Sequence, residues 1–145
     1  MRYTIVALAI ILGATGCGGA SSSSNNTQSG VISIAGTWTG EFVDNAGTLA
    51  GSTAQITETI TGTTATLGGS FEAGIPGSFC GPISGTLSGS VVGTTVQISG
   101  NYTQEGGGTL AFNGQSNPSG TSVSGNFSLS GGCGSTEGSA VFTKG

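Results

Sequence analysis

The sequence contains no histidine, and its only basic residues are Arg2 and Lys144. The lack of histidine excludes Ser-His-Asp catalysis, histidine acid–base chemistry and histidine-ligated metal sites. With a formal net charge of -4 and no basic patch, the chain also lacks the electrostatic means to bind nucleic acid. Its six acidic residues are scattered without a close pair, which favours solvated surface positions over a catalytic carboxylate pair. We therefore expect neither an enzyme nor a protein with a metal or other cofactor.

Charged residues make up only 6% of the chain, whereas glycine alone contributes 30 of the 145 residues. Glycine is destabilising inside helices, and no segment after residue 16 has the apolar spacing of an amphipathic helix. The composition is therefore unlike that of a helical bundle. The length leaves room for a single small domain.

The amino terminus has the pattern of an export signal. Residues 1–3 form a short basic region, and residues 5–12 form an apolar run that ends at Gly13. This run is too short to cross a bilayer, which needs about 20 apolar residues. Small residues follow it, as a signal peptidase requires. We expect residues 1–16 to be a signal peptide.

Residues 14–17, Ala-Thr-Gly-Cys, resemble the lipobox of bacterial lipoproteins. The resemblance implies that Cys17 is acylated, becomes the first residue of the mature chain and anchors the protein in a lipid bilayer. Gly18, where some lipoproteins have Asp, resembles the signal for transfer to the outer membrane. Residues 17–33 are rich in Gly and Ser, which predicts a flexible linker behind the lipidated cysteine. The alternative is an ordinary secretory signal followed by an unrelated cysteine.

Cysteine usage agrees with export. If Cys17 carries lipid, two of the three cysteines remain, Cys80 and Cys133. An even remainder in a chain exported to an oxidising compartment predicts one disulfide. A redox pair is the alternative, but such pairs usually occupy a CxxC motif, which is absent.

From residue 34 onward, apolar residues alternate with small polar ones. Ile83, Leu87 and Val91, for example, share one face with two glycines, while Ser and Thr occupy the other face. This period of two indicates strands with one apolar side. Turn signals between these segments divide the domain into about eight strands. The strands are expected at residues 34–43, 52–61, 63–73, 81–91, 94–104, 108–115, 121–130 and 136–143.

A weak internal repeat accompanies the alternation, in the form apolar, small, Gly, small, large apolar. The central glycines of its four copies are Gly69, Gly85, Gly100 and Gly125. Each faces the same side as its large neighbours. We expect these glycines to make room where a strand bends or where an adjacent aromatic ring lies across it.

The short links predict that successive strands are antiparallel neighbours. Eight such strands, with one apolar face and nothing to cover the sheet edges, are best accommodated by closure into an up-and-down barrel. We therefore expect an all-β barrel domain over residues 34–145. A β-sandwich is the alternative, because the same alternation can serve two packed sheets.

The segment Gly36-Thr37-Trp38 resembles the Gly-x-Trp opening of the first strand in lipocalins and avidin-like barrels. In those families the tryptophan plugs one end of the barrel, and in lipocalins a basic residue of the last strand covers it. The resemblance implies that Trp38 is the plug and that Lys144 covers it by packing and cation–π contact. Other lipocalin motifs and the polar residues of an avidin biotin site are missing, so the resemblance implies an architecture and no particular ligand.

The aromatic residues Phe71, Tyr102, Phe112, Phe127 and Phe142 are candidates for the lining of an internal cavity. They could equally form a packed core, because an eight-stranded barrel either just fills with side chains or holds one small ligand. Our first functional hypothesis is a lipid-anchored, non-enzymatic module that binds a small apolar ligand. The alternative is a structural or interaction protein of the cell envelope, with a filled barrel and an outer surface that meets a protein or glycan.

Overall fold

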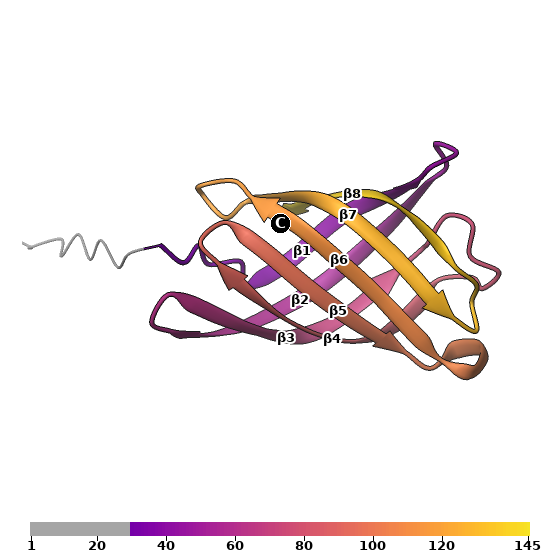
Figure 1. The fold of residues 1–145 in the computed structure, drawn as a ribbon, viewed down its shortest axis with the longest axis horizontal. Helices are drawn as coiled ribbons and strands as arrows, with labels where there is room; N and C mark the ends of the chain where they lie inside the picture. Colours follow the sequence, from indigo (N-terminus) through magenta and orange to yellow (C-terminus); the bar gives the residue numbers. More distant parts are fainter. Residues whose placement is uncertain (1–29) are drawn as a thin grey trace, which may run out of the picture.

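The computed structural model describes residues 30–145. The predicted signal peptide, Cys17 and most of the predicted linker lie outside these residues. Eight antiparallel strands form a closed barrel in which each strand pairs with its neighbours in sequence and β8 pairs with β1 (Figure 1). The elements are β1 (Gly36–Asp44), β2 (Leu49–Thr61), β3 (Thr64–Ala73), β4 (Ile83–Val92), β5 (Thr95–Tyr102), the 3-10 helix η1 (Gln104–Gly106), β6 (Gly108–Ser116), β7 (Ser122–Gly131) and β8 (Thr136–Lys144).

The prediction of an all-β up-and-down barrel is confirmed, and the sandwich alternative is set aside because β1 and β8 close the sheet. The largest difference at a strand boundary is at the start of β2, which begins at Leu49 because this residue already pairs with Val43 of β1. Between the two strands, the Asp44 carboxylate accepts hydrogen bonds from the backbone N–H groups of Ala46 and Thr48, which holds the turn tight. No helix within residues 30–145 has the length and hydropathy of a membrane span.

The alternating pattern decides which side chains form the core. On β4, Ile83, Leu87 and Val91 are buried, while the Ser and Thr residues between them face outward. Burial of these apolar side chains is the main source of stability in such a sheet. Every buried side-chain polar atom in the described part of the chain has a hydrogen-bond partner, so the core carries no unsatisfied group of this kind.

Two of the repeat glycines make room for an aromatic ring. A Cβ atom on Gly100 would lie 2.7 Å from Cε1 of Phe71, and one on Gly85 would lie 3.1 Å from the same atom. Both distances are shorter than an ordinary contact, so a methyl group at either position would displace the ring from where it lies. The ring of Phe71 therefore lies across two neighbouring strands, as the repeat pattern predicts.

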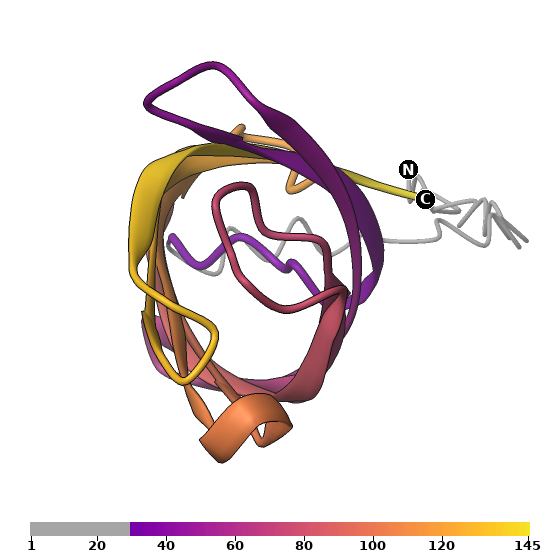
Figure 2. The same ribbon diagram turned by 90° about the vertical axis from the view of Figure 1, so that its right-hand side faces the viewer.

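The two ends of the barrel are closed by different segments. At the end where β1 begins, called the N-terminal end below, residues 30–35 approach the β4–β5 turn: the N–H of Ile32 donates to the carbonyl of Gly93 at 3.4 Å. At the opposite end, the β3–β4 loop (residues 74–82) lies over the barrel opening (Figure 2). A disulfide ties this loop to the β7–β8 loop, and we call this the disulfide end.

Candidate functional site in the barrel interior

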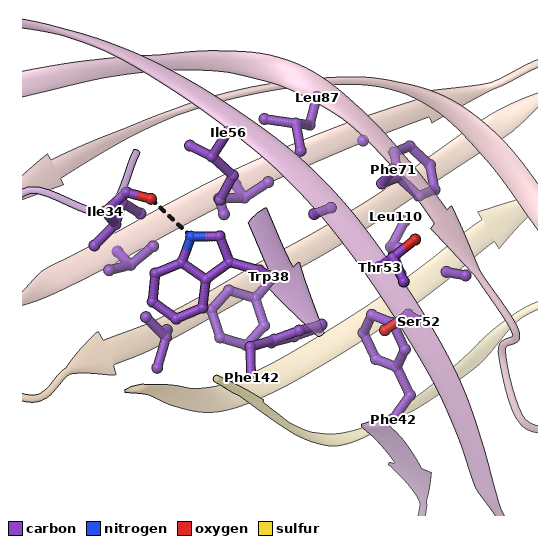
Figure 3. A pocket seen from close by; sticks show the side chains of 17 residues that line it. Ile34, Trp38, Phe42, Ser52, Thr53, Ile56, Phe71, Leu87, Leu110 and Phe142 are labelled. Atoms are coloured by element: carbon purple, nitrogen blue, oxygen red, sulfur yellow. Dashed lines mark hydrogen bonds between the residues drawn. The ribbon is translucent and has the colours of Figure 1, made fainter. Parts of the chain in front are cut away.

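The barrel encloses an apolar cavity of about 70 Å³ (Figure 3). Its lining comes from all eight strands and from the segment before β1, so closure of the barrel creates it. The side chains are aliphatic or aromatic apart from two hydroxyls on β2. The lining residues are Ile34, Trp38, Phe42, Ser52, Thr53, Ala54, Ile56, Phe71, Ala73, Leu87, Val96, Ile98, Gly100, Leu110, Phe112, Val123 and Phe142.

One wall of the interior is a chain of aromatic rings in edge-to-face contact. The ring centroids of Phe42 and Phe127 are 4.8 Å apart, those of Phe42 and Phe142 are 5.3 Å apart, and those of Phe112 and Phe142 are 5.7 Å apart. This geometry stabilises aromatic pairs beyond simple burial. Since the four rings come from β1, β6, β7 and β8, they form a continuous aromatic wall on one side of the barrel.

Trp38 closes the cavity toward the N-terminal end. Its side chain is buried, and its indole N–H donates a hydrogen bond of 2.7 Å to the carbonyl oxygen of Ile34, which is itself buried (Figure 3). The backbone N–H groups of Ile34 and Ala35 both donate to one carboxylate oxygen of Glu58, at 2.9 and 3.2 Å. Glu58 on β2 therefore holds the segment that covers Trp38.

Lys144 stands directly opposite Trp38 in the pairing of β1 with β8. Its side chain passes over Gly36, where an added Cβ atom would lie 2.8 Å from the lysine Cε. The register thus brings together the two residues of the proposed plug. That Lys144 covers the indole by cation–π contact stays a prediction.

The disulfide end is closed by covalent and backbone bonds. The disulfide joins Cys80 to Cys133, as predicted from the cysteine count, and Cys133 is fully buried. The backbone N–H of Phe79 donates to the carbonyl of Cys133, and that of Gly74 donates to the carbonyl of Gly51. Ile75 of the same loop is buried, so the loop contributes to the core at this end.

Of the five aromatic residues proposed to line a cavity, Phe71, Phe112 and Phe142 do so and Tyr102 and Phe127 do not. Tyr102 lies near the disulfide end, where its hydroxyl donates to the carbonyl of Ser130 at 3.1 Å. Phe127 lies behind Phe42 and packs against its ring. All five side chains point inward, but Tyr102 and Phe127 form core contacts away from the cavity.

Sequence reasoning missed two important lining residues, Ile34 and Phe42. Phe42 was detectable, because it occupies an apolar position of an alternating strand. Ile34 alternates with Trp38 in the strand predicted over residues 34–43, but the structure begins β1 only at Gly36, and contacts with Trp38 and Glu58 hold Ile34 at the end of the barrel.

The lining suits an apolar molecule and offers little to a polar one. The polar lining groups are Ser52 and Thr53, and the hydroxyl of Ser52 is already directed at the carbonyl of Gly40. No group of three His, Cys, Asp or Glu side chains that could hold a metal ion occurs within residues 30–145. What the cavity can offer a ligand is apolar contact and exclusion of water.

Comparison with known proteins supports the fold. No protein-family model and no curated protein matches this sequence. Among solved structures, the chain is similar to a protein named EF1p2_mFAP2b, solved bound to DFHBI, with a TM-score of 0.55, 16% identity, and coverage of 77% of this chain and 94% of that one. It is also similar to a redesigned β-barrel, b11L5F_LGL, with a TM-score of 0.50, 16% identity, and coverage of 77% and 91%. The chain thus has the fold of a small eight-stranded barrel, an architecture that also occurs in a structure with a bound small molecule.

Proposed function

We propose that this protein is a non-enzymatic binding module that holds a small apolar molecule inside its barrel, and that it is exported and anchored by lipid on Cys17, in the outer membrane. One of the similar barrels was solved with DFHBI bound, which supports a binding role for this architecture. The observation that carries the proposal for this chain lies in the barrel interior.

That observation is the incomplete burial of side chains that point inward. Ala54, Phe71, Ile98 and Phe142 all line the cavity and belong to apolar strand faces, yet each keeps some accessible surface. Interiors of small domains are normally close-packed. Apolar surface left accessible inside a barrel gains about 25 cal/mol per Å² when a ligand covers it.

The cavity volume limits the ligand. An apolar protein cavity of about 150 Å³ is enough to bind benzene, and typical ligand pockets measure about 300–1,000 Å³. At about 70 Å³, the cavity accepts only a very compact apolar molecule unless the lining moves. Phe71 and Phe142 are the side chains to move, because both are only partly buried. A larger ligand therefore requires new rotamers at these two residues.

The end of the barrel at which the chain from Cys17 arrives also supports the proposed binding role. The described part begins at Gly30, beside the N-terminal end of the barrel. A lipid on Cys17, joined to this end by the predicted flexible linker, would tether the barrel on the side of Ile34 and Trp38. An apolar molecule that leaves the membrane could then reach this end of the barrel directly.

The test is native mass spectrometry of the full chain after incubation with an extract of its own cell envelope. We expect a discrete added mass that disappears on denaturation. Ala54→Phe places a ring inside the cavity and should abolish the added mass. Thr57→Phe adds the same ring to the outer face of the same strand and should leave it unchanged.

A bare mass in both the wild-type chain and the Thr57→Phe variant would contradict the proposal. It would favour the filled-barrel alternative, in which the protein acts through its outer surface on an envelope protein or glycan.

A further inference from the structure

A second hollow lies on the outer face of the barrel, over β5, β6 and β7. It measures about 300 Å³ and shares no lining residue with the interior cavity, although β5, β6 and β7 contribute residues to both. From its shape and chemistry, we propose that this hollow, called the amide groove below, binds a neutral, hydroxyl-rich ligand such as a segment of uncharged oligosaccharide.

Two rows of polar side chains border the amide groove. Gln97, Asn113 and Asn126 form one row, because Gln97 pairs with Asn113 and Asn113 pairs with Asn126 across the three strands. The second row is Thr95, Gln115 and Ser124, which are also successive register partners.

Two glycines form the floor between the rows. Gly114 and Gly125 are direct register partners, and both line the amide groove. A Cβ atom on Gly125 would clash with the backbone of β6, so the two strands approach closely at this point. Both glycines occupy inward-facing positions, since a Cβ atom on Gly114 would lie 2.5 Å from Cζ of the buried Phe112. Their backbone is therefore what lies outward, between two rows of longer side chains that point away from the barrel.

The two rows differ in their hydrogen bonding. The amide of Gln115 is engaged: its oxygen accepts from the hydroxyl of Thr94 at 2.8 Å, and its nitrogen donates to the hydroxyl of Thr95 at 3.1 Å. Within residues 30–145, the side chains of Gln97, Asn113 and Asn126 make no comparable bond, and all three are exposed. Each of these amides has two donors and an acceptor oxygen free for a ligand.

The chemistry of the amide groove excludes other classes of ligand. None of its eight lining residues carries a charge, so an ionic ligand would gain no ion pair there. An extended peptide cannot add to the sheet as a strand, because every strand of the closed barrel is already paired on both sides. An apolar partner finds no large apolar side chain in the groove.

A neutral sugar chain suits the uncharged, polar lining of the amide groove. Sugar hydroxyls, like side-chain amides, both donate and accept hydrogen bonds. Neighbouring strands are about 4.8 Å apart, so the three free amides recur at a spacing on the scale of one sugar ring. The glycine floor would allow the ring to approach the backbone closely.

The experiment is an NMR titration of the isotope-labelled full chain in dodecylphosphocholine micelles, a detergent without sugar. The probes are cellohexaose and maltohexaose, with the acidic hexamer of galacturonic acid for comparison. We expect at least one neutral hexamer to shift the side-chain amide signals of Gln97, Asn113 and Asn126 in a saturable manner. The acidic hexamer should bind at least fivefold more weakly.

Asn113→Ala should weaken binding of that neutral hexamer at least fivefold, because it removes the central amide of the row. Asn101→Ala is the matched control. It removes an exposed amide from β5, the strand that carries Gln97, at a position outside the amide groove. It should leave the affinity within a factor of two.

Three results would overturn the proposal: no saturable shift with either neutral hexamer at millimolar concentration, equal weakening by both variants, or preference for the acidic hexamer. Each variant must keep the dispersed backbone spectrum of the wild-type protein, and Asn126→Ala replaces Asn113→Ala if the latter does not. Binding of a sugar in the amide groove is independent of ligand binding in the interior cavity, because Ala54→Phe blocks the cavity and Ala54 does not line the amide groove.

Discussion

The two ends of this barrel are closed in physically different ways. At the disulfide end, a loop is held over the opening by the covalent bond between Cys80 and Cys133 and by the backbone bond from Phe79 to Cys133. At the N-terminal end, the covering segment is held by hydrogen bonds to Glu58 and Trp38 and by the burial of Ile34.

The difference indicates which end can open. Non-covalent closure costs a few kcal/mol to undo, whereas a disulfide keeps its loop in place even when the backbone bonds around it break. If the interior takes up a ligand, the N-terminal end is therefore its route of entry. Four experiments can break or sharpen this comparison.

Removal of the disulfide should have the largest effect. Cys80 and Cys133 are 53 residues apart in sequence, and cross-linking a loop of this length stabilises a fold by about 4 kcal/mol. The double variant Cys80→Ala, Cys133→Ala should lose about that much free energy of unfolding, measured by urea denaturation. A reducing agent should destabilise the wild-type protein equally and leave the variant unchanged. A loss below about 1 kcal/mol would show that other contacts hold this end.

Trp38→Phe should have the next largest effect. The ring remains apolar, but the carbonyl of Ile34 loses its buried donor, which costs about 2 kcal/mol. We expect amide hydrogen exchange to accelerate at Ile34 and Ala35 and to stay unchanged at Phe79. Equal acceleration at both ends would contradict the independence of the two closures.

Glu58→Ala should destabilise the protein by about 1 kcal/mol, because two backbone donors lose a partly exposed acceptor. Its more informative effect should be on kinetics. Xenon exchange NMR should show several-fold faster entry into the interior, because the covering segment is released. Glu58→Gln keeps an acceptor oxygen and is the matched control. Unchanged entry in Glu58→Ala would rule out the N-terminal end as the route.

Phe79→Ser should have the smallest effect. The ring is 89% exposed although its backbone is held beside the disulfide, and substitution of such a side chain changes stability by about 0.5 kcal/mol or less. The melting temperature should therefore stay close to that of the wild-type protein. A large decrease would show that the ring contributes to the closure of the disulfide end.

The sequence predicted the fold well because a strand face is a local property. Alternation shows which residues point inward, and the turn residues show where strands end. The start of β2 was misplaced because the pairing of Leu49 with Val43 extends the strand beyond its alternating part.

The candidate site was predicted only in part. Phe71 and Phe112 line the cavity, but Tyr102 and Phe127, which have the same inward direction, do not. Alternation gives the direction of a side chain and not its height along the barrel axis. That height depends on the stagger between strands, which is a property of the closed barrel as a whole.

Composition, cysteine count and alternation by themselves determined that the chain forms antiparallel strands with one apolar face and one disulfide, whereas the pairing of β1 with β8 decided that the sheet closes into a barrel. Only the tertiary structure decided that Ile34 and Glu58 close one end, that a small cavity remains beside Phe71, and that three free amides align across the outer face of β5, β6 and β7. The physical reason lies in what sets the place of a side chain. Whether a side chain points inward or outward follows from its place in the alternation along its own strand, whereas its height along the barrel axis follows from the register of eight strands that close on one another.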